Sequence, residues 1–336
     1  MRTIALLLAP LFVPGRPLED VALRFEPEDG TVLKRTFEAH AEYERTDAAL
    51  SIDGEPVEGL ETRELSMVFD EHIAVSDDLR SVADGRPTEL VRTFDDLSQE
   101  TVFTSGEESQ ASSSASDLEG RAVRFKWSDD DYEVATADDG DELDEHVTDW
   151  LDEDMDLRRV LPAEDVAVGD EWEVDPRLYL AFMWPSGLLE FRDDDEQVTE
   201  QDREMNRETI ERLQGTGTAR LEEVREEDGL RLAVIHVELA VTTGCDGTVK
   251  GTVEVEEGEE EEYEVAIEVE IERKIQGTIL WDLEHGHAHS AELEAEASRQ
   301  TTRTRTVETE DGEVEVEESE MLEGTIKYDA TFERAE

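Results

Sequence analysis

The sequence predicts a mainly β protein with some α structure: a curved antiparallel sheet or open β-barrel with a few helices covering its concave face. Long stretches alternate apolar and acidic residues at every second position, which is typical of strands with one buried face. Glycine-containing turn pairs separate many of these stretches, as in antiparallel hairpins. Helical periodicity gathers in residues 141–214, between two strand-rich regions, where it can cover the apolar side of the sheet.

Residues 1–15 have the pattern of a secretory signal peptide. Met1-Arg2 supplies a positive charge, residues 4–13 are apolar except for one proline, and Pro14-Gly15 follows. The apolar stretch is too short to cross a bilayer as a permanent helix, and no later stretch approaches that length. We therefore expect export of the protein without a transmembrane span; an ordinary first strand is the alternative.

The N-terminal β region is expected over residues 16–140. Its candidate strands are residues 32–43, 65–75 and 123–134. Residues 85–103 combine helix-like spacing with Thr, Val and Phe, which favour strands, and we predict a strand there. Residues 105–117 are rich in Ser and Glu with little to bury, so they are expected to form a flexible loop.

The middle segment is expected to be helical. Apolar spacing predicts a helix over residues 143–155 that carries Trp150, a short helix over 176–183, and an amphipathic helix over 200–213 with Gly215 as its C-cap. The helix with Trp150 is the expected cover of the sheet.

The C-terminal region, residues 215–336, is predicted to be an antiparallel meander packed with the N-terminal region as one body. The stretch from Leu230 to Val241 is apolar on both faces, as in a strand covered twice. A three-residue loop over 285–287 would pair Leu283 with His289 and place every apolar residue of that hairpin on one face. The predicted turns are Asp228-Gly229, Asp246-Gly247, Glu257-Gly258, His285-Gly286 and Asp311-Gly312.

Charge excludes two classes of partner. With 93 acidic residues against 31 basic ones, the net charge of −62 repels nucleic acid and anionic lipid headgroups. Only five of the basic residues are lysine. This composition is typical of proteins that work in concentrated salt, where carboxylate repulsion is screened. A genome that prefers arginine codons, with acidity serving solubility alone, is the other interpretation.

Catalytic motifs are missing from the sequence: it has no nucleophile elbow, phosphate-binding glycine loop or His-Glu-x-x-His. We expect no enzyme, no cofactor and no metal-binding residues. His285, His287 and His289 have spacing that could suit zinc, but a solvated hairpin tip is the expected interpretation. Cys245 is expected to lie in a turn, without a catalytic or metal-binding role. Acidic runs at 129–131, 138–145, 193–195 and 256–262 match no twelve-residue calcium loop.

The most distinctive string is residues 161–172, Leu-Pro-Ala-Glu-Asp-Val-Ala-Val-Gly-Asp-Glu-Trp. It predicts a helix stop, a short strand, a Gly-Asp turn and a tryptophan that anchors the next strand. Here the chain resembles uncharacterised exported bacterial β-rich proteins that carry a Leu-Pro…Val-x-Val-Gly-Asp-x-Trp turn near their middle. The hairpin over residues 277–286 is similar to theirs as well. The resemblance implies export and a β-rich fold, and it implies no activity.

The expected function is therefore that of a non-enzymatic envelope or periplasmic protein that binds a hydrophobic ligand or an envelope partner. In shape alone, half-open barrels with internal helices are similar to envelope proteins that carry lipid or lipoprotein acyl chains. A purely structural or interaction module with a filled core is one alternative, and a hydrolase with an unrecognised carboxylate site is another. The apolar residues that could line a pocket, or simply fill the core, are Leu178, Tyr179, Phe182, Met183, Trp184, Leu188, Leu189 and Phe191.

Salt dependence tests the saline interpretation of the acidic surface. At ~1 M KCl the Debye length falls to about 3 Å, which screens repulsion between carboxylates. The urea midpoint of unfolding is expected to rise with KCl. A midpoint that does not increase from low to high KCl contradicts adaptation to salt and leaves solubility as the reason for the acidity.

Overall fold

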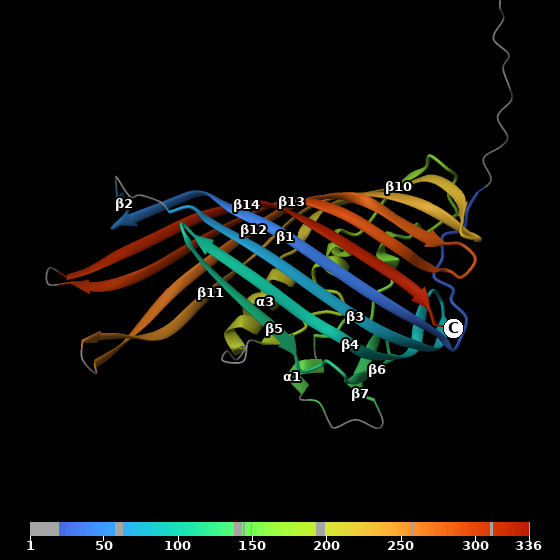
Figure 1. Ribbon diagram of the computed structural model, residues 1–336, viewed down its shortest axis with the longest axis horizontal. Coiled ribbons are helices and arrows are strands. Elements are labelled where there is room, and N and C mark those ends of the chain that lie inside the picture. Colours follow the sequence, from blue (N-terminus) through green and yellow to red (C-terminus); the bar gives the residue numbers. More distant parts are fainter. Residues whose placement is uncertain are drawn as a thin grey trace, which may run out of the picture.

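The alternating stretches form long antiparallel strands in the computed structural model (Figure 1). The structure describes residues 20–57, 63–137, 143, 145–148, 150–192, 199–256, 259–309 and 312–335. The elements in chain order are β1 (Thr31–Ile52), β2 (Glu55–Pro56), β3 (Leu65–Ala83), β4 (Arg86–Ser105), β5 (Glu108–Ser116), β6 (Ala122–Ser128), β7 (Asp131–Thr136), α1 (Glu145–Thr148), η1 (Arg158–Val160), β8 (Glu171–Glu173), η2 (Pro176–Tyr179), α2 (Leu180–Met183), β9 (Phe191–Arg192), α3 (Glu200–Glu211), β10 (Gln214–Glu227), β11 (Leu230–Glu256), β12 (Glu259–Asp282), β13 (His287–Thr309) and β14 (Gly312–Arg334).

The described strands join in one open, antiparallel, 14-stranded sheet, which confirms the predicted mainly β fold. Its main order is β7-β6-β4-β3-β1-β14-β13-β12-β11-β10-β8, with β2, β5 and β9 attached beside this path. Because β1 pairs with β14, the N-terminal and C-terminal strands lie side by side in the same sheet. Short hairpins connect most neighbours, as antiparallel pairing allows.

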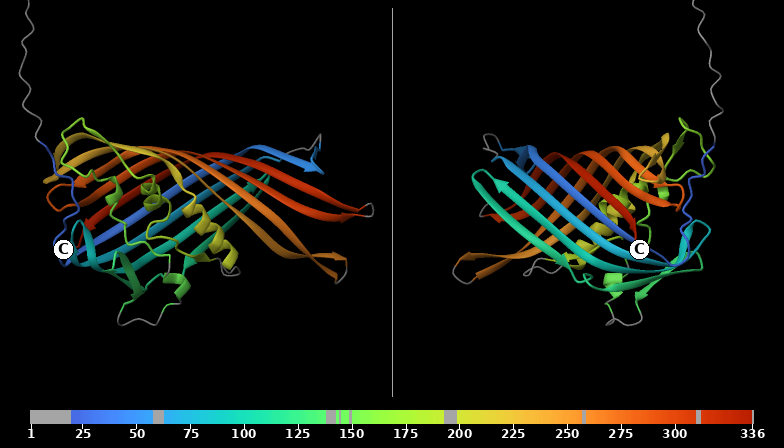
Figure 2. Two further views of the ribbon diagram at one scale, coloured as in Figure 1. Left: turned by 180° about the vertical axis from the view of Figure 1, so that it is seen from behind. Right: turned by 45° about the vertical axis from the view of Figure 1, so that its right-hand side comes forward.

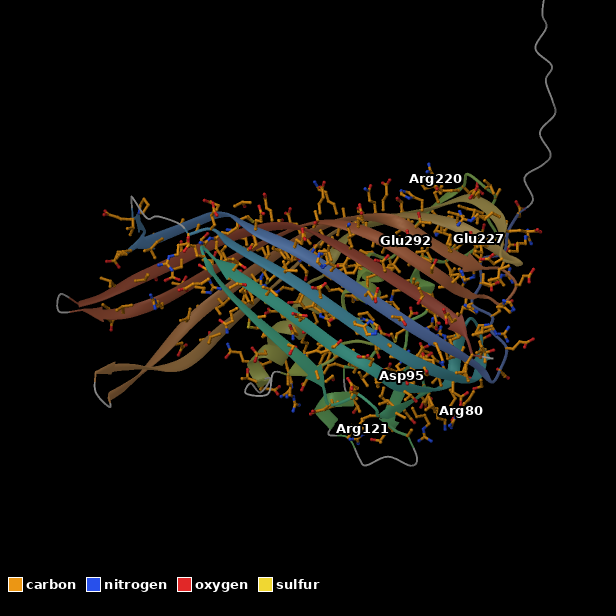
Figure 3. The ribbon with its side chains drawn as sticks, viewed as in Figure 1. Arg80, Asp95, Arg121, Arg220, Glu227 and Glu292 are labelled. Atoms are coloured by element: carbon orange, nitrogen blue, oxygen red, sulfur yellow. The ribbon has the colours of Figure 1, made fainter. Side chains whose placement is uncertain are left out.

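Period-two alternation decides the two faces of this sheet. In β1 and β14, Phe37 and Phe332 are buried on one face and meet edge to face, with ring centroids 5.7 Å apart. Polar residues, many of them acidic, occupy the outward positions of the strands. Asp95 of β4 and Glu292 of β13, for example, are exposed on the outer face (Figure 3). Burial of the apolar face is the main driving force for this arrangement.

Residues 150–192, here called the covering segment, lie across the apolar face together with α3 (Figure 2). Met155, Leu157 and Leu178 of this segment are completely buried in the same core as the inward residues of the strands. The middle of the chain therefore covers the sheet, as predicted. None of the described helices has the length and apolar character needed to cross a membrane.

The predicted helix over residues 143–155 is wrong in most of its length. Helix α1 covers only Glu145–Thr148, and Trp150 lies in a turn beyond it. The short helical stretch at residues 176–183 is confirmed as η2 followed by α2. Helix α3 is also confirmed, and a capping box between Thr199 and Asp202 begins it. Gly215 is not its C-cap, because β10 already begins at Gln214.

Two N-terminal predictions need correction. Residues 105–117 do not form a loop, because β5 pairs backbone to backbone with β4 after a turn at Gly106. Residues 123–134 form two strands, β6 and β7, which are separated by Asp129 and Asp130 with positive φ. The strand predicted over residues 85–103 is confirmed as β4.

Strand β11 runs through the predicted turn at Asp246-Gly247. Gly247 serves close packing instead, since a Cβ there would lie 2.7 Å from the Met205 sulfur of α3. Cys245 is consequently buried within the strand and does not lie in a turn. The turn at Asp228-Gly229 is confirmed, whereas Gly258 and Asp311 lie outside the described residues. Residues from Leu232 to Ile235 are buried on both faces, whereas Glu238 and Ala240 are exposed, so the double cover predicted from Leu230 to Val241 is confirmed only near its start.

The β12–β13 hairpin has a different register from the predicted one. Asp282 pairs with His287 and Ile279 with Ala291, so the alignment along the strands is two residues away from that expected. A bulge near Trp281 and a longer turn account for the difference. The shift is even, so the same apolar residues still occupy one face.

The string at residues 161–172 forms a structural corner, as predicted. The indole Nε1 of Trp172 donates to the Val160 carbonyl at 2.7 Å, which anchors β8 to the turn before it. Gly169 has φ of +99°, and the Asp170 carboxylate accepts from the Ala167 amide at 2.9 Å. Val166 contributes only an isolated bridge to Val21 and not a separate strand.

Candidate functional site

The covering segment crosses the sheet in an irregular path at residues 152–157. The Asp152 carboxylate accepts the Asp154 amide at 2.8 Å, and the Asp154 carboxylate accepts the Asp156 amide at 3.2 Å. Leu157 then adopts a left-handed conformation with φ of +56°. Aspartates that bind the backbone two residues ahead compete with helical hydrogen bonds. This competition explains why the predicted helix ends before this stretch.

Below this segment, the sheet places two arginines and an aspartate on its covered face. Asp77 of β3 and Arg92 of β4 form a bidentate pair with nitrogen–oxygen distances of 2.9 and 2.8 Å. Arg35 of β1 binds the same carboxylate, and all three side chains are fully buried. Burial opposes ionisation of Asp77, but Arg35 and Arg92 outweigh it and lower its pKa.

The same arginines attach the covering segment to the sheet. Arg35 forms an ion pair with the buried Asp156 carboxylate. Arg92 donates to the carbonyls of Asp152 and Glu153 and to the Ser186 hydroxyl, at distances between 2.7 and 2.8 Å. Two parts of the covering segment are therefore bound to one buried guanidinium group.

Above the sheet arginines, a second set of charges lies within the covering segment. Arg158 pairs with Glu153 and Asp154, and Arg159 pairs with Asp152 and Asp154. Burial raises the pKa of the Glu153 carboxyl to about 7, against the attraction of Arg158. Two arginines in this cluster thus face three carboxylates, and the raised pKa of Glu153 reduces the imbalance.

A cleft of about 680 Å³ opens above these ion pairs. Its floor contains Arg158, Arg159 and the acidic residues 152–154. Helix α3 closes one side, where Arg207 stacks on the Trp150 ring at 4.4 Å. The apolar and aromatic residues of its walls are Tyr132, Val134, Trp150, Leu151, Leu180, Trp184 and Ile210. A cleft with apolar walls and a polar floor suits an amphipathic ligand.

A second hollow, of about 720 Å³, lies across the outer side of β10 to β14. Its outward side chains, such as Glu238, Lys274 and Glu294, are polar and exposed. This hollow is a bend in the acidic face of the sheet, and none of its described lining residues is aromatic, unlike those of the cleft.

The apolar cluster expected to line a pocket divides between core and cleft. Leu178, Tyr179 and Phe182 are core residues, and Phe182 packs on Tyr328 with centroids 6.2 Å apart. Trp184 is the member of the cluster that lines the cleft. Met183, Leu189 and Phe191 are partly buried against the same core, so most of the cluster is plain core, which was the alternative interpretation.

The histidines and acidic runs have separate outcomes. His285 and His287 lie together beside Asp282, whereas His289 does not join them. His287 is buried, so the expectation of a solvated hairpin tip is wrong for this residue. The run at 129–131 forms the β6–β7 turn, and most residues of the runs at 138–145 and 193–195 lie outside the described residues.

Sequence reasoning missed Arg35, Asp77 and Arg92. Each stands at an inward position of an alternating stretch, between apolar neighbours such as Leu33 and Phe37 around Arg35. A charge at a position where the pattern demands an apolar residue was the available signal.

Replacement of Asp77 tests the buried ion network. Asp77→Asn keeps the shape but leaves Arg35 and Arg92 short of one negative charge, so the free energy of unfolding should fall by about 3–5 kcal/mol. Urea unfolding at high KCl measures this change. The matched control is Asp165→Asn, which removes an exposed pair with Arg24 and should cost at most about 1 kcal/mol. Equal losses in both variants would contradict the network's role.

The raised pKa of Glu153 predicts a pH dependence of stability. Between pH 4.5 and about 7, the folded protein holds a proton on Glu153 that the unfolded chain releases. The contribution of Glu153 to the free energy of unfolding should therefore decrease as pH rises through this range, by on the order of 3 kcal/mol.

Measuring the difference between the native chain and Glu153→Gln isolates this effect, since the other carboxylates cancel. Glu226→Gln, at an exposed position, is the control and should show no such slope. A difference for Glu153→Gln that stays constant over this range would show that Glu153 keeps an ordinary pKa.

Comparisons with known proteins add little to this geometry. No family model matches the chain, and a search of curated proteins finds no match. Among solved structures, one similarity is to the crystal structure of the P. putida toluene transporter TodX. It has 6% identity over 90% of this chain and 91% of that chain, with a TM-score of 0.12. A score this low does not show a shared fold, and no functional argument is based on it.

Proposed function

We propose that this protein is a non-enzymatic, exported protein of the envelope or periplasm that binds an amphipathic ligand in the cleft above the buried ion network. The cleft itself is the observation that carries the proposal. Its volume of about 680 Å³ falls within the usual range for small-molecule sites. It lies on the outer side of the covering segment, where β7 and helix α3 contribute to its walls.

The chemistry of the lining defines the ligand class. Tyr132, Trp150 and Trp184 offer aromatic surfaces for an acyl chain or a ring. Arg158 and Arg159 already pair with carboxylates, so the floor is polar but nearly neutral. Such a floor suits a small dipolar or hydrogen-bonding head better than a strongly charged one. A filled core with no ligand remains the alternative for the rest of the covered face.

Export is supported by the pattern of residues 1–15, most of which are apolar after a basic start. Residues 1–19 lie outside the described part of the chain. Intact mass measurement on protein from its own cells tests this part of the proposal, because a cleaved chain lacks the mass of this segment. A chain that begins at Met1 would contradict signal-peptide cleavage.

Native mass spectrometry of the same material tests ligand binding directly. We expect a copurifying small molecule with apolar character, whose displacement alters tryptophan fluorescence because Trp150 and Trp184 line the cleft. Trp150→Ala and Trp184→Ala should abolish its retention and weaken the binding of added monopalmitoylglycerol, a neutral amphiphile, by about tenfold or more.

Phe103→Ala is the control for these variants, since Phe103 is an exposed aromatic residue of β4 outside the cleft lining. Retention of the ligand in both cleft variants, or its absence from the native protein together with no binding of monopalmitoylglycerol, would refute the cleft as a ligand site.

A hydrolase is a second candidate, and the raised pKa of Glu153 is the observation that favours it. A carboxyl with pKa of about 7 at the floor of a cleft could act as a general acid. Incubation with the copurified ligand distinguishes the two functions. A binding protein leaves the ligand mass unchanged, whereas a hydrolase releases products and loses that activity in Glu153→Gln.

A further inference from the structure

The tip of the β12–β13 hairpin brings two histidines and one aspartate together, far from the acidic runs of the sequence. Asp282 ends β12, His285 lies in the turn, and His287 begins β13. One potential ligand atom from each of these residues lies within 4.8 Å of the other two. Imidazole and carboxylate groups at this spacing are the donors that divalent transition metals prefer.

The hydrogen bonds of His287 prepare its ring for a ligand. Its Nδ1 lies 2.6 Å from the Ala288 carbonyl oxygen, which can only accept, so Nδ1 carries the proton and donates it. The lone pair is then on Nε2. This atom is buried and has no hydrogen-bond partner among the described residues, on a side chain that is only 2% exposed. Metal-binding histidines are oriented by the same kind of bond to a backbone carbonyl.

Asp282 is also oriented by its surroundings. One carboxylate oxygen accepts the backbone amides of Glu284 and His285 at 2.8 and 3.1 Å. The other oxygen lies 2.6 Å from His285 Nδ1. The carboxylate therefore has one oxygen that shapes the turn and one that faces the imidazole groups. His285 is half-buried and gives this group access to solvent.

We propose that Asp282, His285 and His287 bind one divalent transition metal ion, of which Zn²⁺ is the representative. Three protein donors leave at least one coordination position for water or another ligand. Hard cations such as Ca²⁺ prefer six or more oxygen donors and do not fit this set. The site is independent of the cleft and of the function proposed for it.

The metal would stabilise the contact between residues 24–26, here called the N-terminal segment, and the hairpin tip. The Glu26 amide donates to the Gly286 carbonyl at 2.9 Å, and Trp281 Nε1 donates to the Arg24 carbonyl at 3.2 Å. A Cβ at position 286 would lie 2.7 Å from the Glu26 nitrogen, so the turn and this segment are in close contact. A metal that holds the turn rigid would stabilise this contact, which also places Phe25 in the core.

Calorimetric titration with ZnCl₂ tests the site, in ~1 M KCl so that loose association with surface carboxylates is screened. We expect one equivalent of zinc to bind the full chain, with a rise in melting temperature. His285→Asn and Asp282→Asn should each weaken binding by about tenfold or more. Asp282→Asn keeps the shape of the turn, because asparagine can still accept the two backbone amides.

His289→Asn is the matched control, since His289 lies two residues further along β13 and outside the group. Its zinc affinity should equal that of the native chain. Visible absorption of bound Co²⁺ gives a second readout, which should show low-symmetry coordination that is lost in His285→Asn. Absence of binding, binding of many equivalents, or equal affinity in the native chain, His285→Asn and Asp282→Asn would each overturn the proposal.

Discussion

Arg35 and Arg92 enter the apolar face of the sheet, and the position of the covering segment depends on them. A buried guanidinium group without a partner costs several kcal/mol, and Asp77 alone cannot balance both Arg35 and Arg92. The second negative charge comes from Asp156, which binds Arg35 and lies 121 residues after it in the chain. Hydrophobic burial would allow the cover to slide on the sheet, whereas these directional contacts allow one placement.

This placement also positions the cleft. The stretch that binds the sheet arginines with one side, residues 152–156, contributes acidic side chains to the cleft floor with its other side. Arg158 stacks over Phe25 at 5.3 Å, so the same stretch reaches the N-terminal segment. The hairpin tip lies beside this network. Burial lowers the pKa of His287, and the charges of Asp156 and Arg35 are close enough to affect this pKa as well. Cleft, ion network and tip are therefore adjoining polar parts of the molecule.

Surface charges and interior charges have different surroundings in this protein. The outer face carries the carboxylates behind the net charge of −62, which are separated by solvent and open to screening by salt. Inside, Arg35, Arg92 and Arg158 each bind carboxylates at close range. Arginine suits these positions because its planar group binds two acceptors at once and stays charged when buried. The preference for arginine over lysine thus has a structural use at these sites, whatever its origin elsewhere.

The sequence by itself determined most of the long strands, the period-two choice of their buried faces, and helix α3. Those features follow from period-two and helical spacing and from local capping, which act between near neighbours. Only the tertiary structure decided the strand β5, the continuity of β11 past Gly247, the hairpin register and the irregular path of residues 152–157. Each depends on a partner distant in sequence, as Gly247 depends on Met205 and Asp156 on Arg35. Local sequence patterns do not encode such contacts. Where a segment fits several conformations equally well, its conformation is decided by the residues that pack against it in the folded protein.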